Sequence, residues 1–220
     1  MNKPFAALLL VAAALPVCAQ TYRSQNPYTS GELTLNRSRF EAAAVGASGN
    51  LCQISGRVRQ HIWRDGNGCE VQFKTAKNSI TLSVPEHARE ACSAYCGHNA
   101  SFEQTYHKLP AACTEQAAAQ TERRFQTAYR GKRYADAVKI KQQYLNRCGS
   151  FLHITEQMRT RNDLAVSHKN AGNPAACRRT LQPLAEHMAG SSGFTAPPVY
   201  RESYERELQH ARFNLKACGG

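Results

Sequence analysis

The stretch CSAYCGHNASFEQTYHKLPAAC, residues 92–113, divides the 220-residue chain into two parts with different sequence patterns. Short segments that alternate apolar and polar residues precede it, and longer segments with helical spacing follow it. Three of the chain's nine cysteines lie within it. We interpret this stretch as a rigid coupling between two halves of the protein. We expect Tyr95, Phe102 and Tyr106 to pack at the junction.

The first 19 residues have the features of a secretory signal peptide. Lys3 precedes the apolar run FAALLLVAAAL, which is too short to span a bilayer, and Val17-Cys18-Ala19 provides small residues for cleavage. We expect cleavage near Ala19, although lipidation of Cys18 is an alternative. No later stretch approaches the roughly 20 apolar residues that a spanning helix needs. The mature chain is therefore predicted to be soluble and either periplasmic or secreted.

The chain is strongly basic, and its positive charge is concentrated in the second half. The full chain has 28 Lys and Arg against 16 Asp and Glu, so loss of Lys3 with the signal peptide leaves a net charge of +11. Residues 114–220 contain seventeen of the basic residues and nine of the acids. Such a surface favours an acidic protein or an anionic envelope surface as partner. Nucleic acid is not expected as a ligand of an exported protein, and a solvated basic surface without a specific ligand fits the same composition.

Residues 20–113 predict a small antiparallel β domain. Segments with alternating apolar and polar residues are separated by turn signals such as Gly46-Ala-Ser-Gly-Asn50 and Asp65-Gly-Asn-Gly68. Pro85 ends the last of them. We expect five or six strands that form a curled sheet or a small barrel, within the segments 31–36, 39–45, 51–58, 62–64, 69–73 and 79–84.

The cysteine and aromatic residues of this half resemble those of small exported proteins of Gram-negative bacteria that are described as lysozyme-inhibitor-like. The resemblance covers about residues 30–113 and rests on Cys52, Ile54, Gly56, Trp63, Cys69, Phe73, Cys92, Tyr95-Cys96-Gly97, Ala100, Phe102 and Tyr106. It implies a disulfide-linked β domain that binds another protein. The loop with Ser and Lys that enters the lysozyme cleft in the membrane-bound inhibitors is not identified in this sequence.

Residues 114–220 predict an α-helical hairpin domain, which gives the whole chain an α+β fold. Glycines end several of the helical patterns, and Asn173-Pro174 is a typical helix start. The stretch AGSSGFTAPP, residues 189–198, predicts a linker or exposed loop. The expected helices span 114–130, 132–148, 151–171, 174–188 and 199–217.

A faint internal repeat resembles the turn region of tetratricopeptide repeats. Ala128-Tyr129-Arg130-Gly131, followed by Tyr134 and Ala137, is similar in order to the stretch 172–177 that begins 41 residues after Gly131. The resemblance implies a concave helical face that binds a peptide or protein segment. An ordinary helical bundle is the alternative.

The eight cysteines that remain after signal-peptide cleavage predict structural disulfides, because the compartment is oxidising and their number is even. Cys113 and Cys148 lie at the same end of the first predicted hairpin, and Cys177 and Cys218 lie at matching ends of two later helices. The other four, Cys52, Cys69, Cys92 and Cys96, allow three connectivities, of which a Cys92–Cys96 bridge is disfavoured by its tight loop. A thiol–histidine or metal site at Cys92, Cys96 and His98 is the rival interpretation.

The sequence indicates a binding protein rather than an enzyme. It contains no phosphate-binding glycine loop, His-Glu-x-x-His helix or Gly-x-Ser-x-Gly motif, and we identify no catalytic, cofactor or metal residues. We expect a non-catalytic protein-binding protein, for example an inhibitor or immunity-type factor. The alternatives are an envelope protein whose basic helices bind anionic lipid or lipopolysaccharide, and a cell-wall-acting enzyme.

The candidate binding surface combines basic and aromatic residues from both halves. Trp63 could stack on a carbohydrate or peptide, although packing in the core fits a single tryptophan of a small β domain better. The other candidates lie around the first helical turn signal and are Arg123, Tyr129, Arg130, Lys132 and Arg133.

Overall fold

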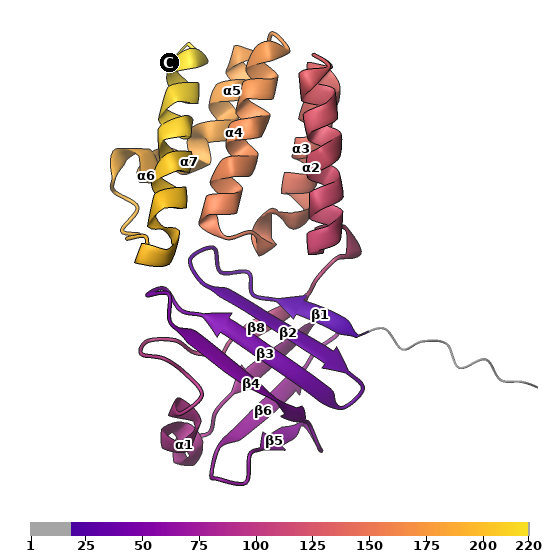
Figure 1. Cartoon of the computed structure of the whole chain (residues 1–220), viewed down its shortest axis with the longest axis vertical. Helices are drawn as coiled ribbons and strands as arrows, with labels where there is room; N and C mark the ends of the chain where they lie inside the picture. Colours follow the sequence, from indigo (N-terminus) through magenta and orange to yellow (C-terminus); the bar gives the residue numbers. More distant parts are fainter. Residues whose placement is uncertain (1–18, 220) are drawn as a thin grey trace, which may run out of the picture.

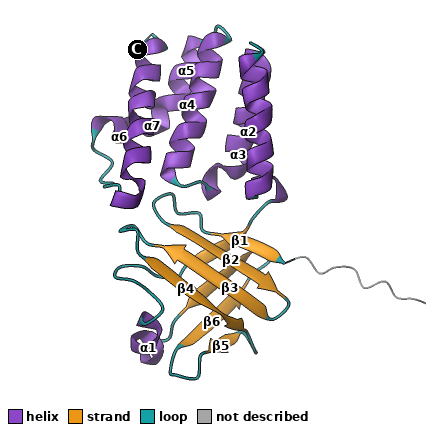
Figure 2. Ribbon diagram, in the orientation of Figure 1, coloured by secondary structure: helices purple, strands orange, loops and turns teal. Residues whose placement is uncertain are grey.

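An antiparallel sheet followed by a helical region confirms the predicted α+β class (Figures 1 and 2). The structure is a computed structural model that describes residues 19–219. The predicted signal peptide up to residue 18, together with Cys18, lies outside the described residues. The sheet forms a curled, nearly closed barrel at one end of the molecule, and the helices stand together at the other end.

The sheet has eight strands, more than the five or six that the sequence predicts. They are β1 (Gln20–Arg23), β2 (Ser30–Asn36), β3 (Arg39–Val45), β4 (Leu51–Arg57), β5 (Ile62–Arg64), β6 (Glu70–Thr75), β7 (Ser79–Ser83) and β8 (Thr105–Lys108). Their order in the sheet is β4-β3-β2-β1-β8-β7-β6-β5. The unpredicted strands β1 and β8 are therefore the central pair that joins two three-stranded meanders into one sheet.

The core of the sheet is built by alternation, because every second residue of β3 and β4 points inward. Phe40 packs edge-on against Trp63 at 5.7 Å between ring centroids. Trp63 is only 7% exposed and lies against the backbone of Gly56, where an added Cβ would collide with the indole. The inner face of β4 therefore has no room for a side chain at Gly56.

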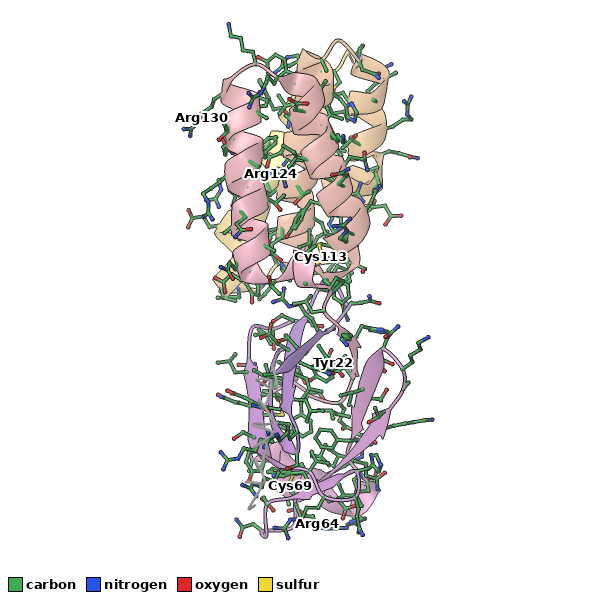
Figure 3. All side chains as sticks on the ribbon, turned by 90° about the vertical axis from the view of Figure 1, so that its right-hand side faces the viewer. Tyr22, Arg64, Cys69, Cys113, Arg124 and Arg130 are labelled. Atoms are coloured by element: carbon green, nitrogen blue, oxygen red, sulfur yellow. A yellow bond between two sulfur atoms is a disulfide. The ribbon has the colours of Figure 1, made fainter. Side chains whose placement is uncertain are left out.

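Tyr95, Phe102 and Tyr106 do not pack at the junction between the halves, and this expectation is wrong. Phe102 and Tyr106 are fully buried in the core of the sheet, where burial raises the pKa of Tyr106 to about 12. The Tyr95 hydroxyl donates to Asp65 at 2.8 Å, in the turn between Arg64 and Cys69, which lie at the end of the sheet away from the helices (Figure 3). The stretch 92–108, which begins within the short helix α1 (Arg89–Ser93), therefore belongs to the sheet half of the molecule.

The helical region follows the predicted pattern except in its fourth segment. Its helices are α2 (Glu115–Arg130), α3 (Tyr134–Cys148), α4 (Ile154–Asn170), α5 (Pro174–Leu181), α6 (Ala185–Ala189) and α7 (Pro198–Ala217). The predicted single helix 174–188 is divided into α5 and α6 by a 3-10 turn at Gln182–Leu184. Pro183 lies in this turn, and its missing N–H and fixed φ disfavour a continuous α-helix there.

The two halves contact each other through loops of the sheet as well as through the connection 109–114. The amide of Ile154 donates to the carbonyl of Pro27 at 2.8 Å. Tyr28, from the β1–β2 loop, stacks on Phe194 with ring centroids 4.7 Å apart. Phe194 comes from the predicted exposed loop 189–198, which is in part buried beneath this contact, since Ala196 is also buried. Residues of the β1–β2 loop therefore take part in the coupling between the halves, and the sequence pattern does not single them out.

Four disulfides join the eight cysteines of the described chain. The predicted pairs Cys113–Cys148 and Cys177–Cys218 are confirmed. In the sheet the bridges are Cys52–Cys96 and Cys69–Cys92, which is one of the connectivities left open by the sequence. Because Cys92 and Cys96 are both in disulfides, the rival thiol–histidine site with His98 is excluded.

Candidate functional site

An open groove on the outer face of the α2–α3 hairpin is the candidate binding site. It has a volume of about 480 Å³. Ala128 and Ile140 form its apolar floor, because both face the hairpin seam and are buried or half-buried. Polar and charged side chains form the walls: Arg123, Arg124, Thr127, Arg133, Asp136, Lys139 and Gln143.

The local sequence explains why this groove forms. In α2 the residues of the wall lie three and four positions apart, so they share one face of the helix. Thr114 caps α2, and its side chain accepts a hydrogen bond from the amide of Ala117, while Gly131 ends the helix and turns the chain back. The short turn from Gly131 to Arg133 then places α3 antiparallel to α2. Figure 3 views this hairpin face on, with Arg124 directed toward α3 and Arg130 at the outer edge of α2.

The groove has an excess of unpaired positive charge. Arg133 lies 3.6 Å from Asp136, which is the one acid of the wall. In the chain from residue 19 to 219, Arg123, Arg124 and Lys139 form no ion pair, and all three are exposed. The groove can therefore accept an anionic group without first breaking internal ion pairs.

A buried cation behind the groove fixes the arrangement of three helices. Lys141 of α3 is almost completely buried, and its Nζ lies 2.7 Å from Glu122 of α2 and 2.6 Å from Asp163 of α4. The same Nζ lies 4.3 Å from the centroid of the Phe125 ring. A buried cation needs such partners because an uncompensated charge is strongly disfavoured in the interior. Lys141 thus sets the position of α3 relative to α2 and α4.

The pKa values of the two carboxylates of this cluster are shifted in opposite directions. Burial acts to raise the pKa of Glu122, but hydrogen bonds from Lys141 and Gln126, together with the charges of Lys141 and Arg159, hold it below its ordinary value. For Asp163 burial dominates and raises the pKa, although Lys141 acts in the opposite direction. The charged form is therefore stabilised at Glu122 and disfavoured by burial at Asp163.

The structure brings together only part of the predicted surface. Arg123 and Arg133 line the groove, while Arg130 and Lys132 lie exposed at the tip of the hairpin. Tyr129 faces the other side, where its ring packs on Phe125 and Tyr134 and its hydroxyl accepts a hydrogen bond from Asn170 at 2.9 Å. The side chain of Tyr129 therefore helps to hold α2 against α4.

Trp63 does not belong to a surface. It lies in the core of the sheet, between Phe40 and Tyr95, in the other half of the molecule. The inclusion of Trp63 among the binding residues is therefore corrected, and its packing agrees with the alternative that the single tryptophan fills the core.

Several groove residues are not identified from the sequence, namely Arg124, Thr127, Lys139 and Gln143. A signal for them is present, since Asp136, Lys139, Ile140 and Gln143 have the spacing of one helical face. The pattern could not show that this face is the one turned away from α4. That information comes from the packing of α3 between α2 and α4.

The groove offers groups that can bind a ligand through charge and hydrogen bonds. Its lining contains cationic groups, one carboxylate, a hydroxyl and an amide. Within residues 19–219 no cluster of three or more His, Cys, Asp or Glu side chains is placed to hold a metal ion.

Four intramolecular disulfides are typical of a protein in an oxidising compartment outside the cytoplasm. None of the helices between residues 19 and 219 combines the length and the apolar character needed to cross a bilayer. Comparisons with protein-family models, with curated proteins and with solved structures find no match to this chain.

Proposed function

We propose that this protein is exported to the periplasm or the medium and binds another protein through an acidic segment that occupies the α2–α3 groove. The observation that supports this proposal most directly is the combination of three unpaired cations with an apolar floor in one open groove. A segment with acidic and apolar side chains matches both features. The proposed role is non-catalytic.

Electrostatics favours such a partner at two stages of binding. The uneven charge of the chain, with most of its excess in the helical half, attracts an acidic partner before contact and increases the association rate. In the groove, Arg124 and Lys139 can then pair with individual carboxylates, while Ala128 and Ile140 cover apolar side chains. Arginine is suited to this contact because its planar group binds a carboxylate through two parallel hydrogen bonds.

The resemblances found in the sequence agree with this proposal. The lysozyme-inhibitor-like pattern implies a protein-binding role in the envelope, and the tetratricopeptide-like turn implies helices that hold a peptide segment. We therefore propose an inhibitor or immunity-type factor as the form that the protein binding takes.

The proposal can be tested by site-specific photo-cross-linking in the native envelope. A photoreactive residue at Gln143 lies in the groove wall, and one at Gln72 on the outer face of β6 serves as the control site. We expect a protein adduct from Gln143 that is absent from Gln72. The double variant R124E/K139E should lose this adduct, while K74E/K77E, which changes the net charge equally, should keep it.

With the purified captured protein, R124E/K139E should bind about 30-fold more weakly or worse, since loss of one partner of a paired charge costs about 2 kcal/mol or more. An equal loss in both double variants would show that only net charge matters. That result, or equal adducts from Gln143 and Gln72, would contradict the proposal.

A second candidate function is supported by the tip of the same hairpin. Arg130 and Lys132 are exposed there and form no ion pair within the described part of the chain. Basic residues at a helix end can contact anionic lipid or lipopolysaccharide. If this is the function, binding to anionic vesicles should fall with salt and should be lost in R130E/K132E but kept in R124E/K139E.

A further inference from the structure

Two arginines lie opposite each other on the exposed face of the sheet, an arrangement that does not stabilise the fold. Arg39 of β3 and Arg57 of β4 are direct partners in the antiparallel register, and both side chains lie on the exposed face of the sheet. Like charges that face each other across two strands are destabilising. Their strands are nevertheless paired throughout their length, so the two arginines extend from directly opposite backbone positions on the same face.

Neither arginine of this pair is engaged in an ion pair within the described part of the chain. Within residues 19–219 neither Arg39 nor Arg57 forms an ion pair with a carboxylate. The nearest acid along β3, Glu41, accepts a hydrogen bond at 3.2 Å from Gln53, its neighbour on β4. The arginine pair therefore has positive charge available for a ligand.

More positive charge lies at the same end of the strands. Arg37 lies in the turn between β2 and β3, and Arg59 follows β4. The two segments are joined by a hydrogen bond of 2.8 Å from the amide of Val58 to the carbonyl of Ser38. In Figure 1 the ends of β2 and β4 and the start of β3 meet at one corner of the sheet. This corner has four arginines and a single neighbouring acid.

The arginine pair lines a hollow that also contains neutral donors and one carboxylate. The hollow has a volume of about 450 Å³, and besides the two arginines its polar lining consists of Thr34, Asn36, Ser55 and Glu41. Behind it, Phe40 and Trp63 pack against each other in the core, which keeps the strands in place. The two cations of the hollow therefore outnumber its single carboxylate, and hydroxyl and amide groups lie beside them.

We propose that Arg39 and Arg57 form a binding site for a phosphate group. Each guanidinium can donate two parallel hydrogen bonds to phosphate oxygens. A phosphate monoester has close to two negative charges at neutral pH and can compensate both arginines, whereas a carboxylate compensates only one. The site lies on the sheet, so it is separate from the α2–α3 groove and does not depend on the function proposed for that groove.

Thermal unfolding with inorganic phosphate as the probe tests this site. Phosphate is added at constant ionic strength, with chloride as the replacement, to the wild type and to R39Q/R57Q and K74Q/K77Q. The last variant removes two exposed basic residues elsewhere on the sheet and controls for net charge. We expect phosphate to raise the Tm of the wild type and of K74Q/K77Q, and to leave the Tm of R39Q/R57Q unchanged.

Without phosphate, R39Q/R57Q should unfold at the same temperature as the wild type or higher, because the like-charge pair is removed. Loss of folding is therefore not the expected outcome for this variant. An equal shift in all three proteins, or no shift in the wild type, would overturn the proposal.

Vesicles identify the source of the phosphate group. Phosphatidylcholine vesicles with and without phosphatidic acid are mixed with the same three proteins. Binding that requires phosphatidic acid and is weakened only in R39Q/R57Q assigns the site to a lipid headgroup. A phosphate-dependent Tm shift without vesicle binding assigns the site to a soluble phosphate ester. Equal weakening of vesicle binding in R39Q/R57Q and K74Q/K77Q would contradict binding of a lipid headgroup at this site.

Discussion

Removal of the Cys113–Cys148 disulfide should loosen the α2–α3 hairpin before it affects the sheet. The bridge joins cysteines 35 residues apart, and the chain-entropy relation gives about 4 kcal/mol for a loop of this length. Both sulfurs are buried beside Leu109, Tyr144 and Phe151. The double variant C113S/C148S keeps the side-chain volume nearly constant, so the main expected effect is the loss of the cross-link.

The position of the bridge predicts where the effect appears. α2 packs mainly on α3, and the bridge is the covalent link between their ends near the sheet. Hydrogen exchange measured by mass spectrometry should show faster exchange in α2 and α3 and unchanged protection in β2, β3 and β4. Denaturant unfolding should give a free energy of unfolding of the helical region lower by about 4 kcal/mol.

A matched variant makes the test specific. C177S/C218S removes a bridge between cysteines 41 residues apart, at the opposite end of the helices. It should increase exchange in α5 and α7 and leave α2 protected. If C113S/C148S instead lowers the protection of the strands as much as that of α2, the two halves unfold as one unit. That result would contradict the prediction that the hairpin loosens before the sheet.

Three further predictions concern single positions. Lys141→Met should lower the free energy of unfolding by about 3 kcal/mol, because Glu122 and Asp163 lose their cation. A change below about 1 kcal/mol in denaturant unfolding would show that the cluster does not stabilise the fold. Burial lowers the pKa of His187 from its ordinary value of 6.5. As the pH falls, the unfolded state therefore takes up a proton before the folded state does, and the free energy of unfolding should fall below about pH 6.5. H187Q should flatten this part of the profile of stability against pH, and an unchanged profile would contradict the role of His187. Gly56→Ala should cost about 1 to 3 kcal/mol by overpacking against the indole of β5, and an unchanged Tm would contradict that contact.

Much of the fold can be predicted from local patterns, and the missing parts have a common physical reason. The strands with long alternation and the helices with glycine stops are found where they are expected. β1 and β8 are not predicted, because each has only four residues and too little alternation to stand out. Their strand structure comes from pairing with each other and with their neighbours in the middle of the sheet.

Only two of the four disulfides could be predicted from the sequence. Helix topology is sufficient to pair Cys113 with Cys148 and Cys177 with Cys218. The pairing of Cys69 depends on how the sheet curls, because α1 must fold back to bring Cys92 beside the start of β6. Residue spacing along the chain does not contain that information.

The candidate groove could be predicted only in outline. The concentration of basic residues in the first hairpin is visible in the sequence and leads to Arg123 and Arg133. The other groove residues depend on which face of α3 packs on α4. The buried contacts of Lys141 with Glu122 and Asp163 fix that face. A lysine in a basic helix is expected to be exposed, so its burial between two carboxylates is a tertiary effect.

Binding of an acidic segment in the α2–α3 groove can be observed by backbone amide NMR with an acidic probe peptide. The probe is a short peptide of alternating glutamate and leucine, and a peptide of alternating lysine and leucine is the control. We expect shift changes confined to the stretches 123–128 and 133–143, with the acidic peptide only, and their loss in R124E/K139E. Changes spread over the whole basic surface, or centred on the sheet, would contradict a binding site in the α2–α3 groove.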